Sequence, residues 1–157
     1  MLYYTEVCLS PYEVPDNKAI CIYISGCMNR CAECHYPLLQ RNDYGDLLAD
    51  NFHSIIELYR VYATCVCFFG EGRNTEEEHK EFEGMISYAK KQGLKTCLYC
   101  GRNTEIEHWM MQFDYIKTGS FQAELGGLNE RTTNQKMYEK TNGEYRNVTH
   151  KFWKQEG

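Results

Sequence analysis

Three cysteines stand close together directly after an apolar stretch. Cys27, Cys31 and Cys34 have the spacing C-x-x-x-C-x-x-C, and they follow the run from Ala19 to Ser25. A loop with this spacing can close three thiolates around one metal centre. A four-iron four-sulfur cluster normally takes one thiolate on each iron, so a site with three leaves one iron open to a small molecule. An open coordination position is typical of reactive metal sites rather than structural ones.

The cysteines belong to a segment that runs from Gly26-Cys27 through Cys34-His35, and four more motifs follow it along the chain. These are Asp114 to Gly119, Leu125 to Leu128, Thr132 to Gln135, and the closing Phe152-Trp153. Together they resemble the activating proteins of anaerobic ribonucleoside-triphosphate reductases, which belong to the radical S-adenosylmethionine (SAM) superfamily. The resemblance runs from about Tyr3 to Trp153. The cysteine triplet alone indicates only the superfamily, and the later motifs point to the reductase activases.

The resemblance implies both a reaction and its cofactors. Cys27, Cys31 and Cys34 would hold a [4Fe-4S] cluster, and SAM would occupy the fourth iron through its amino nitrogen and carboxylate. One electron from the reduced cluster would cleave SAM to methionine and a 5′-deoxyadenosyl radical. That radical would take a hydrogen from a backbone glycine of the reductase large subunit, so the protein would be an oxidoreductase with a protein substrate. Catalytic groups beyond the cluster and SAM are not expected, because the protein's task is to orient the cofactor.

Electrons for this reaction would come from outside the chain. The sequence holds no second cluster motif, so an external one-electron donor such as flavodoxin is expected.

Five residues are candidates for holding SAM. Members of the family carry a Gly-Gly-Glu or similar motif after the second strand, and here we find Gly70, Glu71 and Gly72 in a different order. That order leaves open whether the Glu71 side chain or a nearby backbone carbonyl meets the SAM ammonium, or whether Glu71 is a solvated loop carboxylate. Arg102 can bind a carboxylate bidentately, although a surface arginine is an equal alternative. By the resemblance, Tyr36 would flank the adenine.

Alternative interpretations of the cysteines remain open. Activation of a different glycyl-radical enzyme is the alternative within the same chemistry. A non-catalytic binding module is the alternative outside it, because Cys31, Cys34, Cys97 and Cys100 would together supply the four thiolates of a structural zinc site. The pattern C-x-x-C-H, ending at His35, also matches covalent haem attachment. Two observations argue against haem: such attachment normally follows export, whereas no secretory signal is expected here, and Cys27 would be left without a role.

The other cysteines have simpler interpretations. Cys21, Cys65 and Cys67 stand inside apolar runs, where a free thiol behaves as a small hydrophobic group. We expect Cys97 in the core and Cys100 near the site.

Composition narrows the class of protein. With 157 residues and 43% hydrophobic residues, the chain fits one globular domain over 1–157, with a core of about 19–120 and a C-terminal extension of about 121–157. A net charge of -5 gives no basic footprint, so no nucleic-acid partner is expected. We expect no membrane partner and a cytoplasmic location, because no long apolar run or secretory signal occurs. Nine cysteines in the cytoplasm indicate metal or redox chemistry.

The elements predicted to carry the candidate site residues are alternating strands and helices. Apolar runs predict buried strands at 19–25, 64–69, 94–99 and 114–117, with weaker signals for strands at 3–10, 137–140 and 145–150. Helical spacing of apolar residues from Leu48 to Tyr62 predicts one helix. A second is predicted from a capping box at Thr75 and Glu78 to the residues before Gly93, and a short third from about Thr104 to Met111.

This alternation predicts an α/β fold with a mostly parallel sheet. The units are too few to close an eight-stranded barrel, so we expect an open, partial (β/α) barrel, and the resemblance implies that it is of the radical SAM type. In such sheets ligands bind at the carboxyl ends of the strands. The cysteine loop, Gly70 to Gly72, Cys100 to Arg102 and Thr118 to Ser120 all leave those ends.

Overall fold

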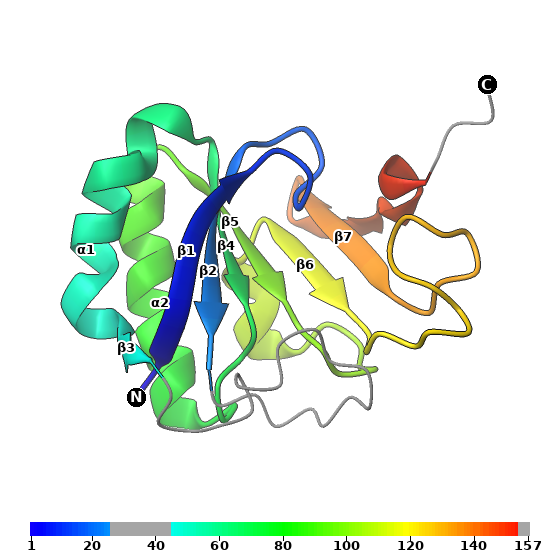
Figure 1. Cartoon of the computed structure of the whole chain (residues 1–157), viewed down its shortest axis with the longest axis horizontal. Helices are drawn as coiled ribbons and strands as arrows, with labels where there is room; N and C mark the ends of the chain where they lie inside the picture. The colour runs from blue at the N-terminus through cyan, green and yellow to red at the C-terminus, as the bar shows by residue number, and fades with distance from the viewer. Residues whose placement is uncertain (26–44, 154–157) are drawn as a thin grey trace.

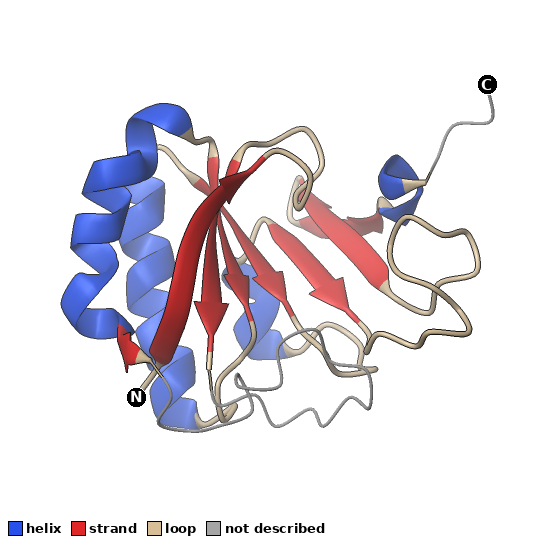
Figure 2. Ribbon diagram, viewed as in Figure 1, coloured by secondary structure: helices blue, strands red, loops and turns tan. Residues whose placement is uncertain are grey.

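One eight-stranded sheet organises the protein (Figures 1 and 2). The computed structural model describes residues 1–25 and 45–153. Along the chain the strands are β1 (Tyr3–Ser10), β2 (Ala19–Ile24), β3 (Asp46–Leu47), β4 (Cys65–Phe69), β5 (Lys95–Tyr99), β6 (Tyr115–Thr118), β7 (Lys136–Thr141) and β8 (Glu144–Asn147). In the sheet their order is β3-β1-β2-β4-β5-β6-β7-β8. The predicted α/β class is confirmed, and the described strands do not show a barrel.

The sheet is mixed, and it is parallel only in its middle. β2, β4, β5 and β6 pair in parallel, whereas β1, β3, β7 and β8 join the sheet in antiparallel pairings. The prediction of a mostly parallel sheet is therefore wrong for its two flanks. Short connections explain two of these pairings, β1 with β2 and β7 with β8, because parallel neighbours need a longer crossover.

A tight hairpin joins the last two strands. Asn142 and Gly143 both have positive φ, 52° and 81°, as a two-residue turn of the mirror-image type requires. β7 and β8 therefore extend the sheet beyond residue 120 instead of forming a separate unit.

Two long helices cover one face of the sheet (Figure 1). They are α1 (Leu48–Tyr59), which continues into the 3₁₀ turn η2 (Arg60–Tyr62), and α2 (Glu76–Lys91). Thr75 caps α2, because its side chain accepts a hydrogen bond from the backbone N–H of Glu78 at 3.3 Å. The Glu78 carboxylate accepts from the backbone N–H of Arg73 at 2.7 Å. Both predicted helices are confirmed.

The predicted third helix begins later than expected. The structure has a 3₁₀ helix, η3, only over His108–Gln112, while residues 103–106 form a loop. Arg102 bonds to Glu107 across this loop, and Asn103 bonds to Ser120 after β6. These side-chain contacts accompany a non-helical path between β5 and η3. A last 3₁₀ turn, η4, spans Thr149–Phe152.

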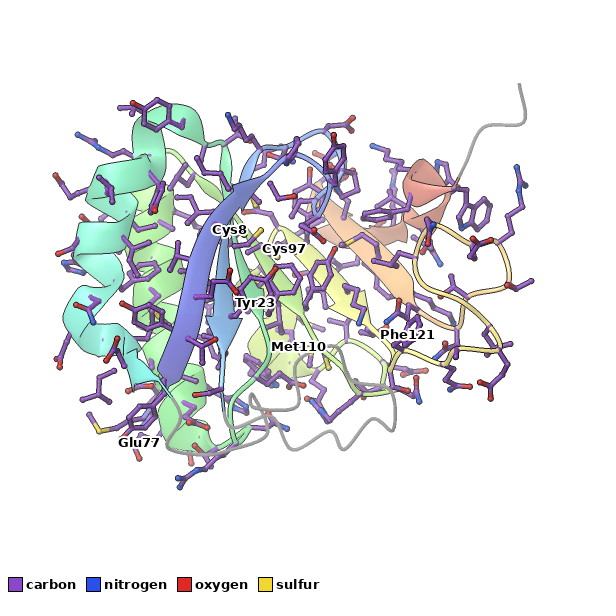
Figure 3. All side chains as sticks on the ribbon, viewed as in Figure 1. Cys8, Tyr23, Glu77, Cys97, Met110 and Phe121 are labelled. Atoms are coloured by element: carbon purple, nitrogen blue, oxygen red, sulfur yellow. The ribbon has the colours of Figure 1, made fainter. Side chains whose placement is uncertain are left out.

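Each face of the sheet has its own hydrophobic core. The helix face packs Ile20, Ile22, Val66, Phe68 and Leu98 against α1 and α2. The opposite face, which we call the cysteine face, carries the side chains of Cys21, Cys65, Cys67 and Cys97. Figure 3 labels Cys8, Tyr23 and Cys97, which belong to this second cluster. The four strands predicted from apolar runs are therefore buried on both faces, as parallel strands usually are.

Within residues 1–25 and 45–153, none of the helices has the length and apolar character needed to cross a bilayer.

Candidate functional site

The carboxyl ends of the four parallel strands meet at one edge of the sheet. In Figure 1 the arrowheads of β2, β4, β5 and β6 all point toward this edge. We call it the rim and define it by Ser25, Gly70–Gly72, Cys100–Arg102 and Thr118–Ser120. The predicted convergence is confirmed for the three described loops, which leave β4, β5 and β6. Cys27, Cys31, Cys34 and Tyr36 lie outside the described residues, so the cluster ligands and the adenine contact stay predictions.

Gly70 brings the loop after β4 against the end of β2. Its φ is +118°, and a Cβ built on it would lie 3.3 Å from the carbonyl oxygen of Ile24 and 3.4 Å from the Ile24 Cβ. Its N–H donates to the carbonyl of Tyr99 at 3.0 Å, which ties the loop to β5 as well. A glycine is favoured here because other residues rarely adopt this φ. The Gly70–Gly72 segment is thereby held beside Ser25, two residues before Cys27 in the sequence.

Glu71 is buried at the rim, with 5% of its surface exposed. Arg102 approaches it side-on: Nε donates to Oε1 at 3.0 Å and Nη2 donates to Oε2 at 2.8 Å. The two residues are 31 positions apart in the sequence, and the neighbouring strands β4 and β5 bring them together. Glu71 is therefore not the solvated loop carboxylate of the alternative interpretation. Bidentate pairing of this kind is among the stronger charge-assisted contacts in proteins.

A second carboxylate binds the other edge of the same guanidinium. Arg102 Nη1 donates to Glu107 Oε2 at 3.1 Å, and Nη2 donates to Glu107 Oε1. The hydrogen bonds with Glu71 and then Glu107 raise the pKa of Arg102 above its ordinary value. The hydrogen bond with Arg102 lowers the pKa of Glu107. Sequence reasoning missed Glu107, because no pattern distinguishes it from other glutamates in loops.

Aromatic packing extends this network toward α2. Trp109 Nε1 donates to Glu107 Oε1 at 3.0 Å, and the Trp109 ring stacks on His79 with centroids 4.0 Å apart. The other side of the imidazole contacts Asn74, whose Oδ1 is 2.6 Å from His79 Nε2. Burial lowers the pKa of His79, which favours the neutral ring. The loops that follow β4 and β5 are thus joined to α2 and η3 by side-chain contacts.

Cys100 completes the environment of Glu71. Its buried Sγ donates to Glu71 Oε1 at 2.8 Å. Burial, together with the nearby Glu71 carboxylate, raises the pKa of Cys100 to about 12, so the group is a thiol near neutral pH. Cys100 therefore lies near the site, and Cys97 lies in the core of the cysteine face, as we expected.

Four of the described cysteines form a row across the cysteine face. Cys8, Cys21, Cys67 and Cys97 occupy paired positions on β1, β2, β4 and β5. Burial raises the pKa of Cys21 and of Cys67, which keeps both thiols protonated. The part of the chain that the structure describes contains no group of three or more potential metal ligands. Cys21, Cys65 and Cys67 are packed in a hydrophobic cluster as small apolar groups, as predicted.

Aromatic rings fasten the strand ends next to the rim on the cysteine face. Tyr23 stacks on Phe69 with centroids 4.8 Å apart, and Phe69 packs against Tyr99 at 4.3 Å. Lys117 Nζ lies 5.5 Å from the Tyr99 ring centroid and donates to the carbonyl of Gly119 at 2.8 Å. Cross-strand pairs of this kind stabilise neighbouring strands. Side-chain contacts therefore connect the ends of β2, β4, β5 and β6 next to the rim.

Ser25 carries a buried polar group at the rim. The residue is 2% exposed, and its Oγ has no hydrogen-bond partner among the described residues 1–25 and 45–153. A buried hydroxyl without a partner is unfavourable, and such groups are uncommon in folded proteins. Its position immediately before the cysteine segment fits a site that takes a polar cofactor.

Comparison of the chain with protein-family models gives no match, and neither do comparisons with curated proteins or with solved structures.

Proposed function

We propose that this protein is a cytoplasmic radical SAM activase that generates a glycyl radical on the large subunit of an anaerobic ribonucleoside-triphosphate reductase. The observation that carries the proposal is that the cysteine triplet directly follows β2 in the sequence. β2 ends at Ile24, next to the rim that holds Glu71 and Arg102, and Cys27 is the third residue after Ile24 along the chain. Metal-ligand spacing in the sequence and the ligand-binding edge of the sheet therefore coincide.

The residues of the rim fit the proposed cofactors. Cys27, Cys31 and Cys34 would hold the cluster, and the backbone of Gly70–Gly72, the Ser25 hydroxyl and the Glu71 carboxylate would bind polar groups of SAM. The cluster and SAM would together supply the hydrogen-abstracting radical. The chain's own part is to hold SAM in one orientation and to exclude water, which suits the buried Glu71.

The barrel form of the fold is part of the same proposal. We infer that the sheet is an open, partial barrel of the radical SAM type, in which β2, β4, β5 and β6 provide the consecutive parallel strands. The reductase large subunit would then cover the open side while its glycine is oxidised. An external one-electron donor such as flavodoxin would reduce the cluster.

Anaerobic reconstitution with iron and sulfide tests the function. Electron paramagnetic resonance of the dithionite-reduced protein should show a cluster signal that changes when SAM is added, because SAM occupies the open iron. Methionine and 5′-deoxyadenosine should then accumulate. Replacing any one of Cys27, Cys31 or Cys34 with alanine should abolish SAM cleavage, while Cys97→Ala, in the core of the cysteine face, should leave much of it.

The partner needs a separate measurement. Mixing the reduced protein and SAM with the large subunit of the reductase should produce a glycyl-radical signal on that subunit. SAM cleavage without this signal would favour activation of a different glycyl-radical enzyme. A protein that takes up about one zinc and no iron would overturn the radical SAM proposal.

A further inference from the structure

We propose that Arg102 and Glu107 are positioning residues that hold the Glu71 carboxylate in place at the rim, and that Arg102 does not itself bind the ligand. The proposal rests on the function proposed above, in which Glu71 meets the ammonium group of SAM. It changes the role expected for Arg102 from the sequence, where it was a candidate for the SAM carboxylate.

The hydrogen bonds of Arg102 argue for this role. Its guanidinium makes four of them, two to Glu71 and two to Glu107. A guanidinium has five N–H donors, so only one is left for any other group. Binding a ligand carboxylate bidentately would require Arg102 to release one of its two glutamates. Release of Glu71 would leave a buried carboxylate without its counter-charge, which is strongly unfavourable.

The charge of the cluster points to a cationic ligand group. Two carboxylates face one guanidinium, so Glu71, Arg102 and Glu107 together carry a net charge of -1. Arg102 offsets one of these charges and fixes the plane of the Glu71 carboxylate. The uncompensated negative charge can then attract an ammonium group. An anionic group would instead meet both carboxylates.

Glu107 supports Arg102 from the side opposite Glu71. It is itself held by Trp109, whose ring packs on His79 of α2. Loss of Glu107 leaves the guanidinium fastened at one edge only. We therefore expect Glu107→Gln to increase the alkylation rate of Cys100 and to weaken SAM binding, as Arg102→Gln does, but by smaller factors.

Cys100 provides a measurement that needs neither cofactor nor activity. Its thiol donates to Glu71 Oε1 and is fully buried, so alkylation must wait for this part of the rim to open. In the folded protein without cofactors, iodoacetamide should modify Cys100 at least about tenfold faster in Arg102→Gln than in the wild type. Fragment mass spectra of the peptide that holds Cys100 locate the modification. Arg102→Lys keeps the charge but loses the bidentate geometry, so it should restore part of the protection.

Matched control variants distinguish loss of the Arg102 contacts from general destabilisation of the fold. Arg60→Gln removes an exposed arginine that donates to the neutral side chain of Gln92, and Glu105→Gln removes a glutamate two residues from Glu107. Neither variant should change the alkylation rate of Cys100. Circular dichroism establishes that each variant is folded at the temperature of the assay.

SAM binding to the reconstituted protein completes the test. The dissociation constant should rise in Arg102→Gln and partly recover in Arg102→Lys. Weaker SAM binding in Arg102→Gln with unchanged Cys100 protection would overturn the proposal, because Arg102 would then contact the ligand directly. Unchanged protection together with unchanged binding would overturn it as well. If Cys100 is alkylated faster in Arg102→Gln but the wild-type protein binds no SAM, the positioning of Glu71 by Arg102 is supported and the proposed function is refuted.

Discussion

Cys97 and Cys100 place their thiols on opposite faces of the sheet. Cys97 packs among the residues of the cysteine face, while Cys100 packs on the helix face and bonds to Glu71. Side chains three positions apart along a strand point to opposite sides, because the side-chain period of a strand is two. One zinc ion cannot take both thiols in this arrangement. The alternative of a zinc site built from Cys31, Cys34, Cys97 and Cys100 therefore finds no support in the geometry of its two described members.

Replacing these two cysteines tests that conclusion. Cys97→Ala and Cys100→Ala should leave the zinc content unchanged, and Cys97→Ala should lower the free energy of unfolding by about 1 kcal/mol through lost packing. Elemental analysis of the purified variants and urea unfolding measure the two effects. About one zinc per chain in the wild type, lost in both variants, would contradict the expectation.

Acid should weaken the contact between Arg102 and Glu107. The hydrogen bond with Arg102 lowers the pKa of Glu107 in the folded state. Its contribution to stability is therefore present above the unfolded pKa, about 4.3, and is lost as the pH falls through the folded value. Glu107→Gln should be less stable than the wild type at pH 7, by less than about 1 kcal/mol because the group is partly exposed, and the difference should shrink near pH 3. Urea unfolding at both values measures this, and a constant difference would contradict it.

Two glycines should respond to alanine in opposite ways. Gly84 lies within α2, and a Cβ there meets nothing within 4 Å, so Gly84→Ala should raise the free energy of unfolding by about 1 kcal/mol. Gly119 has a φ of +102°, and its Cβ would lie 3.0 Å from the Cα of Gln135. Gly119→Ala should lower stability by about 1–3 kcal/mol. Thermal melts of the two variants give the sign of each change in stability. Equal shifts would contradict the expectation that the backbone conformation at Gly119 requires a glycine.

Thr75 should matter to α2 through its side-chain oxygen alone. Thr75→Ala removes the acceptor for the N–H of Glu78 and should cost about 1 kcal/mol of stability. Thr75→Ser keeps the oxygen and should retain most of the wild-type value. Urea unfolding of the two variants makes the comparison, and equal losses would show that the methyl group rather than the cap is responsible.

Ser25 should have opposite effects on stability and on cofactor binding. Ser25→Ala removes a buried hydroxyl that has no partner among the described residues, so the protein without cofactors should be as stable as the wild type or up to about 1 kcal/mol more stable. If the hydroxyl serves the proposed site, the reconstituted variant should bind SAM more weakly. Thermal melts and equilibrium binding measure the two effects. A clear loss of stability in the cofactor-free protein would mean that Ser25 has a structural partner.

The sequence by itself determined the local structure of this protein. Apolar runs marked β2, β4, β5 and β6, helical spacing marked α1 and α2, and Thr75 marked the start of α2. These features depend on neighbours a few positions apart, so periodicity and capping rules reach them. The rim followed as well, because parallel strands end at one edge. The cysteine triplet lies outside the described residues and stays a prediction.

Only the tertiary structure decided what the rim residues touch. The sequence brought Glu71 and Arg102 to one edge, but their pairing across 31 residues depends on the register of β4 and β5. The role of Glu107 depends on the loop before η3, where a helix was predicted, and on its position immediately before η3. The antiparallel flanks likewise depend on which edge of the sheet each strand joins. Contacts between distant segments are fixed by packing and register, and a pattern along the chain does not record these.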